Sequence, residues 1–116
     1  MKYMLLIYGD EEKMRAIPKE DAMKMMPAYA AYTEALKKAG ILLGGDRLQF
    51  TSYATTVRIR DGKTNVVNGP YAEAKEHLAG YYLIDVPDMD SALSWAARCP
   101  GAATGGLEVR PIWAMQ

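Results

Sequence analysis

The sequence predicts an α+β fold of the ferredoxin-like type, in which a split βαβ arrangement carries an inserted β-hairpin. Segments with strand and helix patterns follow one another in the order strand, helix, strand, hairpin, strand, helix, strand. Near the middle of the chain, Asp61-Gly62 is a strong signal for a two-residue hairpin turn. A chain of 116 residues is long enough for one domain, over residues 1–116, and too short for two.

The N-terminal part begins with a strand and a long helix. Residues 2–8 are apolar on both faces of the expected strand. Residues 11–17 can form a short helical turn, and a longer helix is expected over residues 19–39, ended by Gly40. Pro27 lies inside this helix and should kink or split it. Side chains three and four residues apart form its predicted buried stripe, namely Met25, Tyr29, Tyr32, Leu36 and Ala39.

The middle of the chain is expected to contain a second strand and the hairpin. Residues 41–48 favour a strand, in which Gly44-Gly45 indicates a bulge or the close approach of another group. Residues 55–60 alternate between the two faces of a strand and return through residues 65–67. We expect this hairpin to be an appendage on the edge of the main sheet. Gly69-Pro70 then forms a turn, because proline restricts its predecessor and lacks a backbone donor.

The C-terminal part repeats the pattern of strand, helix and strand. Residues 71–77 are expected to be a helical turn or an ordered loop, and residues 80–86 a strand. Asp88 is the expected N-cap of the second helix, which ends before a loop of small residues. The last strand covers residues 107–113, and Pro111 argues that it lies at a sheet edge. The predicted buried stripe of the second helix is Met89, Ala92, Leu93 and Ala96.

The apolar strands predict a homodimer. Two helices can cover only one face of the sheet, yet residues 2–8 and 80–86 are largely apolar on both faces. A single chain would therefore expose a broad apolar face, which soluble monomers rarely tolerate. We expect sheet-on-sheet packing of two copies related by a two-fold axis.

Composition and charge argue against several classes of partner and site. The 14 Lys+Arg residues balance 14 Asp+Glu, so the net charge gives no reason to expect nucleic acid or an acidic membrane as a partner. The longest apolar runs are far shorter than the roughly 20 residues of a membrane span. Cys99 is the only cysteine, which excludes an internal disulfide and fits a reducing, cytoplasmic location. One histidine and one cysteine form no zinc pattern, and we expect neither a metal nor a cofactor.

Three residues are candidates for acid/base catalysis: His77, Tyr71 and Asp46. His77 is the only histidine, and histidine titrates near neutrality without help; the alternative is a surface histidine at the start of a strand. Tyr71 follows the Gly-Pro turn, where it can donate a hydrogen bond to a substrate or simply pack over the sheet. Asp46 follows the glycine pair, where it can orient a substrate or form an ordinary salt bridge.

Four further residues are candidate ligand contacts: Tyr29, Arg47, Glu73 and Tyr82. Glu73 belongs to a polar cluster that can line the mouth of a pocket or remain solvated. Arg47 can act as the orienting cation beside Asp46. Tyr29 and Tyr82 can line a cavity between the sheet and the first helix, or belong to the core and the dimer interface.

Six stretches of this sequence match the pattern of a known family, namely residues 39–48, 57–63, 69–76, 80–86, 95–98 and 108–112. Together they resemble the DGPF branch of the YCII-related proteins, small bacterial domains of the dimeric α+β-barrel class. The resemblance covers nearly the whole chain. The branch signature Asp-Gly-Pro-Phe is Asn68-Gly69-Pro70-Tyr71 here, so two of its four positions differ.

The resemblance implies a barrel completed by two copies and, for most members, no established activity. Members of the DGPF branch are often encoded beside extracytoplasmic-function sigma factors, which implies an alternative role as a non-enzymatic accessory or regulatory protein. In the YCII branch a histidine on the first helix has been suggested as catalytic; the matching position here is Tyr29, so that mechanism does not carry over. We therefore expect a cytoplasmic homodimer that binds a small molecule or catalyses a cofactor-free acid/base reaction. The sequence does not decide whether it is an enzyme.

Overall fold

A computed structural model of the chain describes residues 1–72 and 74–114. Its main element is a four-stranded antiparallel sheet in the order β2-β5-β1-β6. The strands are β1 (Lys2–Gly9), β2 (Leu42–Arg47), β5 (His77–Asp85) and β6 (Gly106–Pro111). This strand order, with helices between the strands, is that of the ferredoxin-like split βαβ arrangement, so the predicted fold class is confirmed.

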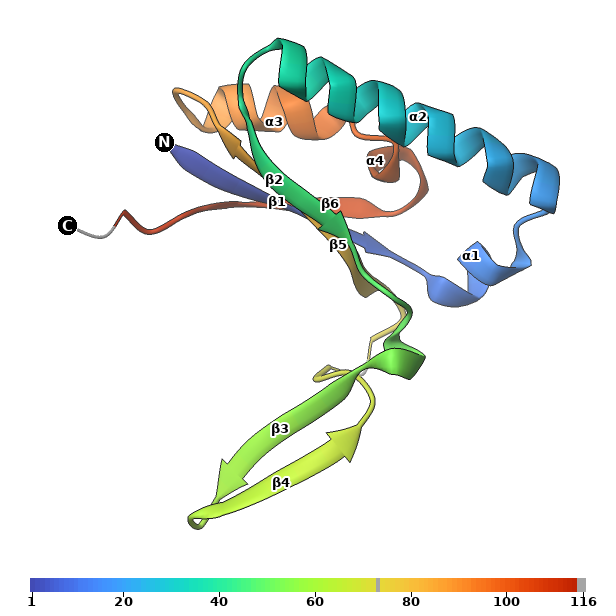
Figure 1. Cartoon of the computed structure of the whole chain (residues 1–116), viewed down its shortest axis with the longest axis vertical. Helices are drawn as coiled ribbons and strands as arrows, with labels where there is room; N and C mark the ends of the chain where they lie inside the picture. The colour runs from blue at the N-terminus through green and yellow to red at the C-terminus, as the bar shows by residue number, and fades with distance from the viewer. Residues whose placement is uncertain (73, 115–116) are drawn as a thin grey trace.

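The helices α2 (Lys19–Lys38) and α3 (Met89–Ala97) lie on one face of the sheet (Figure 1). In each helix, apolar side chains three and four residues apart form a stripe along one side, and in each strand every second side chain points to the same face. The helix stripes therefore pack against the side chains that the central strands direct toward them. The buried core formed there includes Tyr3, Leu5, Ile7, Tyr32, Leu36, Ile84, Ala92 and Ala96. Within the described ranges, no helix combines the length and apolar character needed to cross a membrane.

The short helix α1 (Glu11–Ala16) follows β1 directly and turns the chain toward α2. Asp10 is its N-cap, and the Asp10 carboxylate accepts hydrogen bonds from the backbone N–H groups of Glu12 and Lys13 at 3.0 and 3.3 Å. Glu11 and Glu12 occupy the first turn, where the helix dipole stabilises acidic side chains. This cap fixes the orientation of Glu11, whose side chain turns inward.

The hairpin consists of β3 (Thr55–Arg60) and β4 (Lys63–Asn68), which pair only with each other and form a separate two-stranded sheet. Asp61 and Gly62 join them with φ angles of 52° and 74°, as a two-residue turn with two left-handed positions requires. Figure 1 shows the hairpin extending away from the rest of the chain. The radius of gyration is 16.2 Å, whereas a compact chain of this length has about 13 Å.

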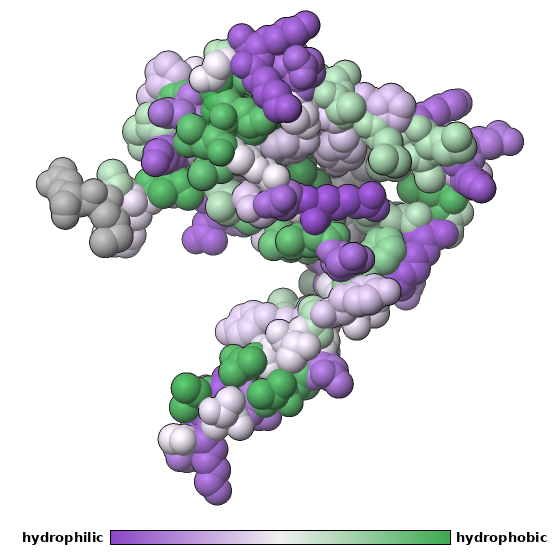
Figure 2. Space-filling model, in the orientation of Figure 1, coloured by the Kyte–Doolittle hydropathy of each residue, from purple (hydrophilic) through white to green (hydrophobic). Residues whose placement is uncertain are grey.

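Among residues 1–72 and 74–114, nothing covers the sheet face opposite the helices. Met4 and Leu6 of β1 and Leu83 of β5 point to this face and are only half-buried. The hairpin exposes further apolar side chains, and Figure 2 shows hydrophobic atoms along its surface. These are Val57, Ile59, Val66 and Val67. The sheet stays open, so one chain does not close a barrel by itself.

The structure differs from the sequence prediction in several local respects. Leu93, predicted to belong to the buried stripe of α3, is 49 % exposed, because it lies on the side of the helix that faces away from the core. Pro27 does not split α2, because it lies on the exposed side, where water can bond the carbonyl that loses its partner. The expected loop of small residues contains a short helix, α4 (Gly101–Thr104), which is packed against β1 and β6. Strand β5 begins at His77 rather than at Gly80, because pairing with the end of β1 extends it.

Candidate functional site

Two adjoining cavities lie where the hairpin joins the sheet. The polar cavity has a volume of about 280 Å³ and is lined by Asp10, Glu11, Glu12, Arg15, Thr51, Ala74, Lys75 and His77. The aromatic cavity has a volume of about 600 Å³, and its walls include Tyr8, Leu48, Phe50, Tyr53, Tyr71 and Leu78. Thr51, Ala74 and His77 line both cavities, so the two spaces adjoin at these residues.

Glu11 supplies a fixed carboxylate to the polar cavity. It is 7 % exposed, although it borders an open cavity, and it is the one charged residue buried in the described part of the chain. One carboxylate oxygen accepts the backbone N–H of Thr51 at 2.8 Å, and the other accepts the Thr51 hydroxyl at 2.5 Å. Burial alone would raise the pKa of Glu11, but these two hydrogen bonds, with His77 and Arg15 nearby, hold it below its ordinary value of 4.5. Glu11 is therefore ionised at neutral pH.

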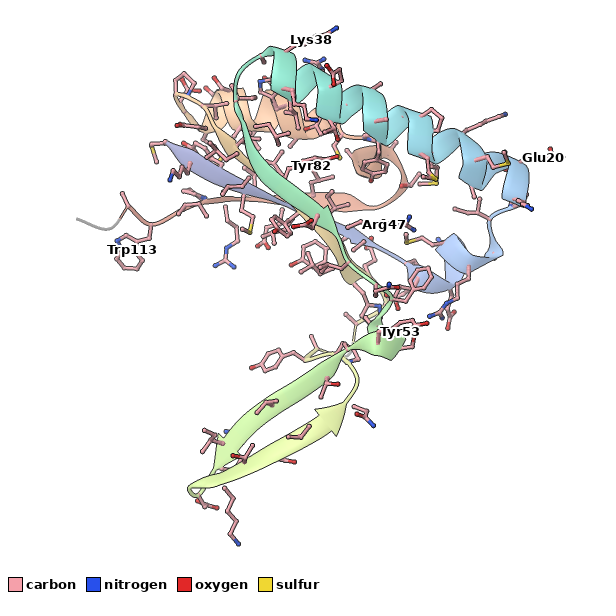
Figure 3. The ribbon with its side chains drawn as sticks, in the orientation of Figure 1. Glu20, Lys38, Arg47, Tyr53, Tyr82 and Trp113 are labelled. Atoms are coloured by element: carbon pink, nitrogen blue, oxygen red, sulfur yellow. The ribbon has the colours of Figure 1, made fainter. Side chains whose placement is uncertain are left out.

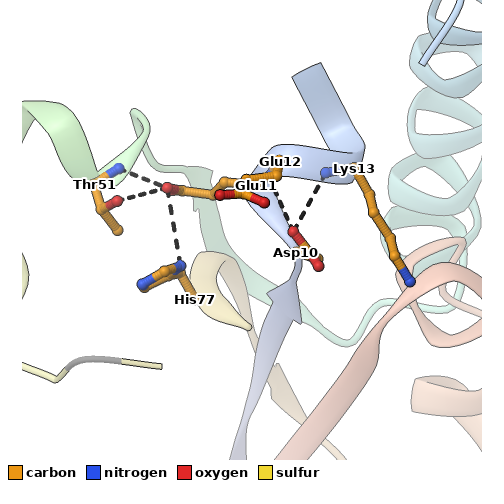
Figure 4. Close-up of polar contacts among 6 residues, drawn as sticks. All are labelled: Asp10, Glu11, Glu12, Lys13, Thr51 and His77. Atoms are coloured by element: carbon orange, nitrogen blue, oxygen red, sulfur yellow. Dashed lines mark hydrogen bonds and ion pairs between the residues drawn. The ribbon is translucent and has the colours of Figure 1, made fainter. Parts of the chain in front are cut away.

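His77 lies beside this carboxylate, and both side chains line the polar cavity (Figure 4). Its Nδ1 atom is 3.9 Å from Glu11 Oε1, an ion-pair distance that exceeds a hydrogen bond. Nδ1 is buried and has no hydrogen-bond partner among the residues that the structure describes. The other ring nitrogen points away from Glu11 in Figure 4. A histidine held between a carboxylate on one side and open space on the other has the arrangement of a general base and its orienting acid.

The sheet register brings Glu11 and His77 together. Strands β1 and β5 are antiparallel, and the last pair in their ladder is Gly9 with His77. Glu11 follows Gly9 by two residues, so the start of α1 lies over the start of β5. Thr51 reaches the same place from the short 3₁₀ helix η1 (Thr51–Tyr53) that precedes the hairpin. The sequence interpretation missed Glu11, because the pairing of β1 with β5 that places it beside His77 cannot be read from any local pattern.

Tyr71 lies at the aromatic cavity, on the loop that follows the hairpin. Its ring is covered by the Arg58 guanidinium, whose Cζ is 4.5 Å from the ring centroid. Tyr71 and His77 therefore both line the aromatic cavity, and the sequence had placed them in one segment. Glu73, the predicted contact beside them, lies outside the described residues.

Asp46 and Arg47 lie on strand β2, the edge strand next to β5. The Asp46 carboxylate accepts a hydrogen bond from the Tyr81 hydroxyl at 2.9 Å. This hydrogen bond raises the pKa of Tyr81, because it favours the protonated phenol. Neither Asp46 nor Arg47 is among the residues that line the two cavities. Their predicted roles toward a ligand stay predictions.

Tyr29 and Tyr82 lie on the helix side of the sheet, where Figure 3 shows Tyr82 between α2 and the strands. The Tyr82 hydroxyl is 2.8 Å from the Thr33 hydroxyl, and its ring packs edge-on against Tyr32 with the centroids 5.3 Å apart. Burial raises the pKa of Tyr29 to about 12. Both rings pack against the core cluster, and a role for either in ligand binding stays a prediction.

Metal-binding geometry is not part of this arrangement. Among residues 1–72 and 74–114, no group of three or more histidine, cysteine or acidic side chains is placed to hold a metal ion. Cys99 is buried beside Tyr29, and burial raises the pKa of its thiol. The chemistry that the described side chains can supply at the cavities is proton transfer by His77 and hydrogen bonding by Thr51, Lys75 and the tyrosines.

Comparison with known proteins assigns the family. The model of the YCII-related domain matches residues 1–116. The chain is also 40 % identical over 114 residues to "Uncharacterized protein R00369" of Rhizobium meliloti (strain 1021). The aligned residues cover 97 % of this chain and 92 % of that protein. With the family pattern matched from the first residue to the last, the chain belongs to the YCII-related family.

Proposed function

We propose that this protein is a homodimer that binds a small molecule at the polar cavity and transfers a proton there without a cofactor. The observation that carries the proposal is the pair formed by an ionised, buried Glu11 and the unpartnered Nδ1 of His77, at the wall of a cavity. Buried polar atoms are nearly always hydrogen-bonded, and exceptions occur at functional sites. A cytoplasmic location, expected from the lone Cys99, belongs to the same proposal.

In this proposal each side chain has one role. His77 takes a proton from the substrate at its outward ring nitrogen, and the resulting imidazolium is stabilised by Glu11 across the 3.9 Å gap. Thr51 holds the Glu11 carboxylate with two hydrogen bonds, so this carboxylate keeps its orientation toward His77 during the reaction. Tyr71 contributes a hydrogen bond from the aromatic cavity. This role of Glu11 toward His77 is one that the sequence analysis assigned to no residue.

The homodimer proposal rests on two unpartnered apolar surfaces. The open face of the sheet presents Met4, Leu6 and Leu83, and the hairpin presents exposed valines and Ile59. An isolated two-stranded hairpin is marginally stable in water, so a long hairpin with exposed β-branched residues favours a covering partner. A second copy offers the same two surfaces, as a two-fold interface requires. Sheet-on-sheet packing would then complete the α+β barrel.

The first experiment is a thermal-shift screen of small metabolites on the wild type, Glu11→Gln and His77→Ala. A ligand that binds the native state raises the melting temperature by mass action. We expect a ligand whose stabilising effect is lost in His77→Ala and reduced in Glu11→Gln. Asp46→Asn tests the other predicted carboxylate, which lines neither cavity; under this proposal the variant should keep the effect, and its loss would favour the predicted role of Asp46.

Three outcomes of the screen decide between the functions. A ligand that shifts the wild type and Asp46→Asn but neither site variant supports the acid/base site. A ligand that shifts all four proteins equally contradicts a role for His77. If no compound shifts the wild type while a protein partner is captured equally by wild type and His77→Ala, the accessory or regulatory function replaces the enzymatic one.

A further inference from the structure

The aromatic cavity is a second part of the site, with a chemistry that the polar cavity lacks. Four aromatic side chains contribute to its walls, namely Tyr8, Phe50, Tyr53 and Tyr71. Arginine stacks on two of these rings: the Arg15 Cζ atom is 4.7 Å from the Phe50 centroid, and the Arg58 Cζ atom is 4.5 Å from that of Tyr71. Such a contact favours one orientation of the ring. Tyr53 and Tyr71 are each 74 % exposed, so their rings are accessible to a flat apolar group at the mouth of the cavity.

The two cavities adjoin at His77, so a molecule in the aromatic cavity reaches a residue that also lines the polar cavity. His77 and Thr51 line both spaces, and the combined site passes from an apolar end to a polar end. Ligand sites in proteins combine a mostly apolar wall with a few placed polar groups in this manner. A molecule whose ring fills the aromatic cavity would present its polar end to the outward nitrogen of His77.

Charge at the polar end selects against anions. Asp10, Glu11 and Glu12 all line the polar cavity, against Arg15 and Lys75. Arg15 keeps its positive charge while it stacks on Phe50, so the three acidic residues exceed the two basic ones by one, and the Glu11 carboxylate is ionised. Glu76 is the one charged side chain among the residues that line the aromatic cavity, apart from His77. A carboxylate ligand would thus meet like charge at the place where His77 must act.

We propose that the ligand is an uncharged, ring-bearing compound with a weakly acidic proton, either a phenolic O–H or a C–H next to a carbonyl. Its aromatic body lies between Tyr53, Tyr71 and Phe50, and its acidic proton is directed at His77. The reacting step breaks one O–H or C–H bond and forms one N–H bond on His77, while the electron pair stays on the ligand as a phenolate or enolate. This inference rests on the proposed acid/base function and adds the substrate class.

The test uses three matched probes: 2-naphthol, 2-naphthoate and decahydro-2-naphthol. They separate the effects of ring aromaticity and charge, and calorimetry measures the dissociation constant of each. We expect 2-naphthol to bind most tightly, decahydro-2-naphthol more weakly and 2-naphthoate most weakly. Tyr53→Ala and Tyr71→Ala should each weaken 2-naphthol binding about two- to tenfold, as expected for the loss of one aromatic contact. Trp113→Ala is the control, because Trp113 is 90 % exposed on the C-terminal tail and lines neither cavity (Figure 3).

Each result bears on one of the two proposals. Binding of 2-naphthoate as tight as that of 2-naphthol, or an equal loss in Trp113→Ala and Tyr53→Ala, overturns the substrate class. The absence of binding by all three probes also overturns it, while the metabolite screen still decides the proposed function. The pH dependence of 2-naphthol binding tests proton acceptance, since it should differ between wild type and His77→Ala. If ring binding follows the expected order and this pH dependence is unchanged, the aromatic site stands and the acid/base function fails.

Discussion

Two regions of the molecule, the helix face of the sheet and the base of the hairpin, are held together by different interactions. On the helix face, the side chains are buried by neighbours at regular spacing, as with Leu5, Leu36 and Ile84, which are fully buried. At the hairpin base, Glu11, Thr51 and His77 come from three separate segments and are joined by polar contacts beside open space. The first region gains its stability from apolar burial, whereas the second uses hydrogen bonds to hold a charge where a ligand can reach it.

The largest effect should come from the helix face. Leu36→Ala removes a fully buried side chain, and we expect it to lower the free energy of unfolding by about 2–5 kcal/mol. Chemical denaturation monitored by circular dichroism measures this. Met23→Ala on the same helix is the control, because Met23 is 66 % exposed and its loss should change stability by no more than about 0.5 kcal/mol. Equal effects of the two variants would contradict the assignment of this helix face to the core.

The second-largest effect should come from the hydrogen bonds between Thr51 and Glu11 at the hairpin base. Thr51→Val keeps the backbone N–H bond to Glu11 and removes the hydroxyl bond, so a buried carboxylate loses one partner. We expect a loss of about 1–3 kcal/mol in the free energy of unfolding, measured by urea denaturation. Thr55→Val is the matched control on the exposed hairpin. A Thr51→Val protein as stable as the control would mean that Glu11 does not depend on Thr51.

The same contrast explains how much the sequence can predict. Leu36 and Ile84 were found because local periodicity alone decides which side of a helix or strand is apolar. His77 and Tyr71 could be named as candidates because their residue types stand out in a short polar segment. Glu11 was missed because its importance depends on pairing between β1 and β5, and on Thr51 from a third segment. In sequence, Glu11 is one of two acids in a helical first turn, and nothing local separates it from Glu12.

A third effect tests whether a second copy covers the hairpin. In a single chain, Ile59 is 70 % exposed, so Ile59→Thr should change the unfolding of that chain very little. If the hairpin packs against a partner, the same change should weaken the dimer by about 1 kcal/mol, roughly fivefold in the dissociation constant. Analytical ultracentrifugation measures this constant. Met26→Thr, on an exposed part of α2, should leave it unchanged, and a monodisperse wild-type monomer at micromolar concentration would contradict the dimer itself.

The smallest effect concerns a single carboxyl group and its response to pH. Because the pKa of Glu11 is lower in the folded protein than its ordinary value of 4.5, folding favours the ionised form. That contribution to stability is complete above pH 4.5 and is lost as the pH falls through the folded-state pKa. We therefore expect urea midpoints measured from about pH 6 to about pH 3 to fall less steeply in Glu11→Gln than in the wild type. Glu34→Gln, on the exposed side of α2, should keep the wild-type slope. Identical slopes in all three proteins would show that folding does not lower the pKa of Glu11 and that the hydrogen bonds from Thr51 do not favour its ionised form.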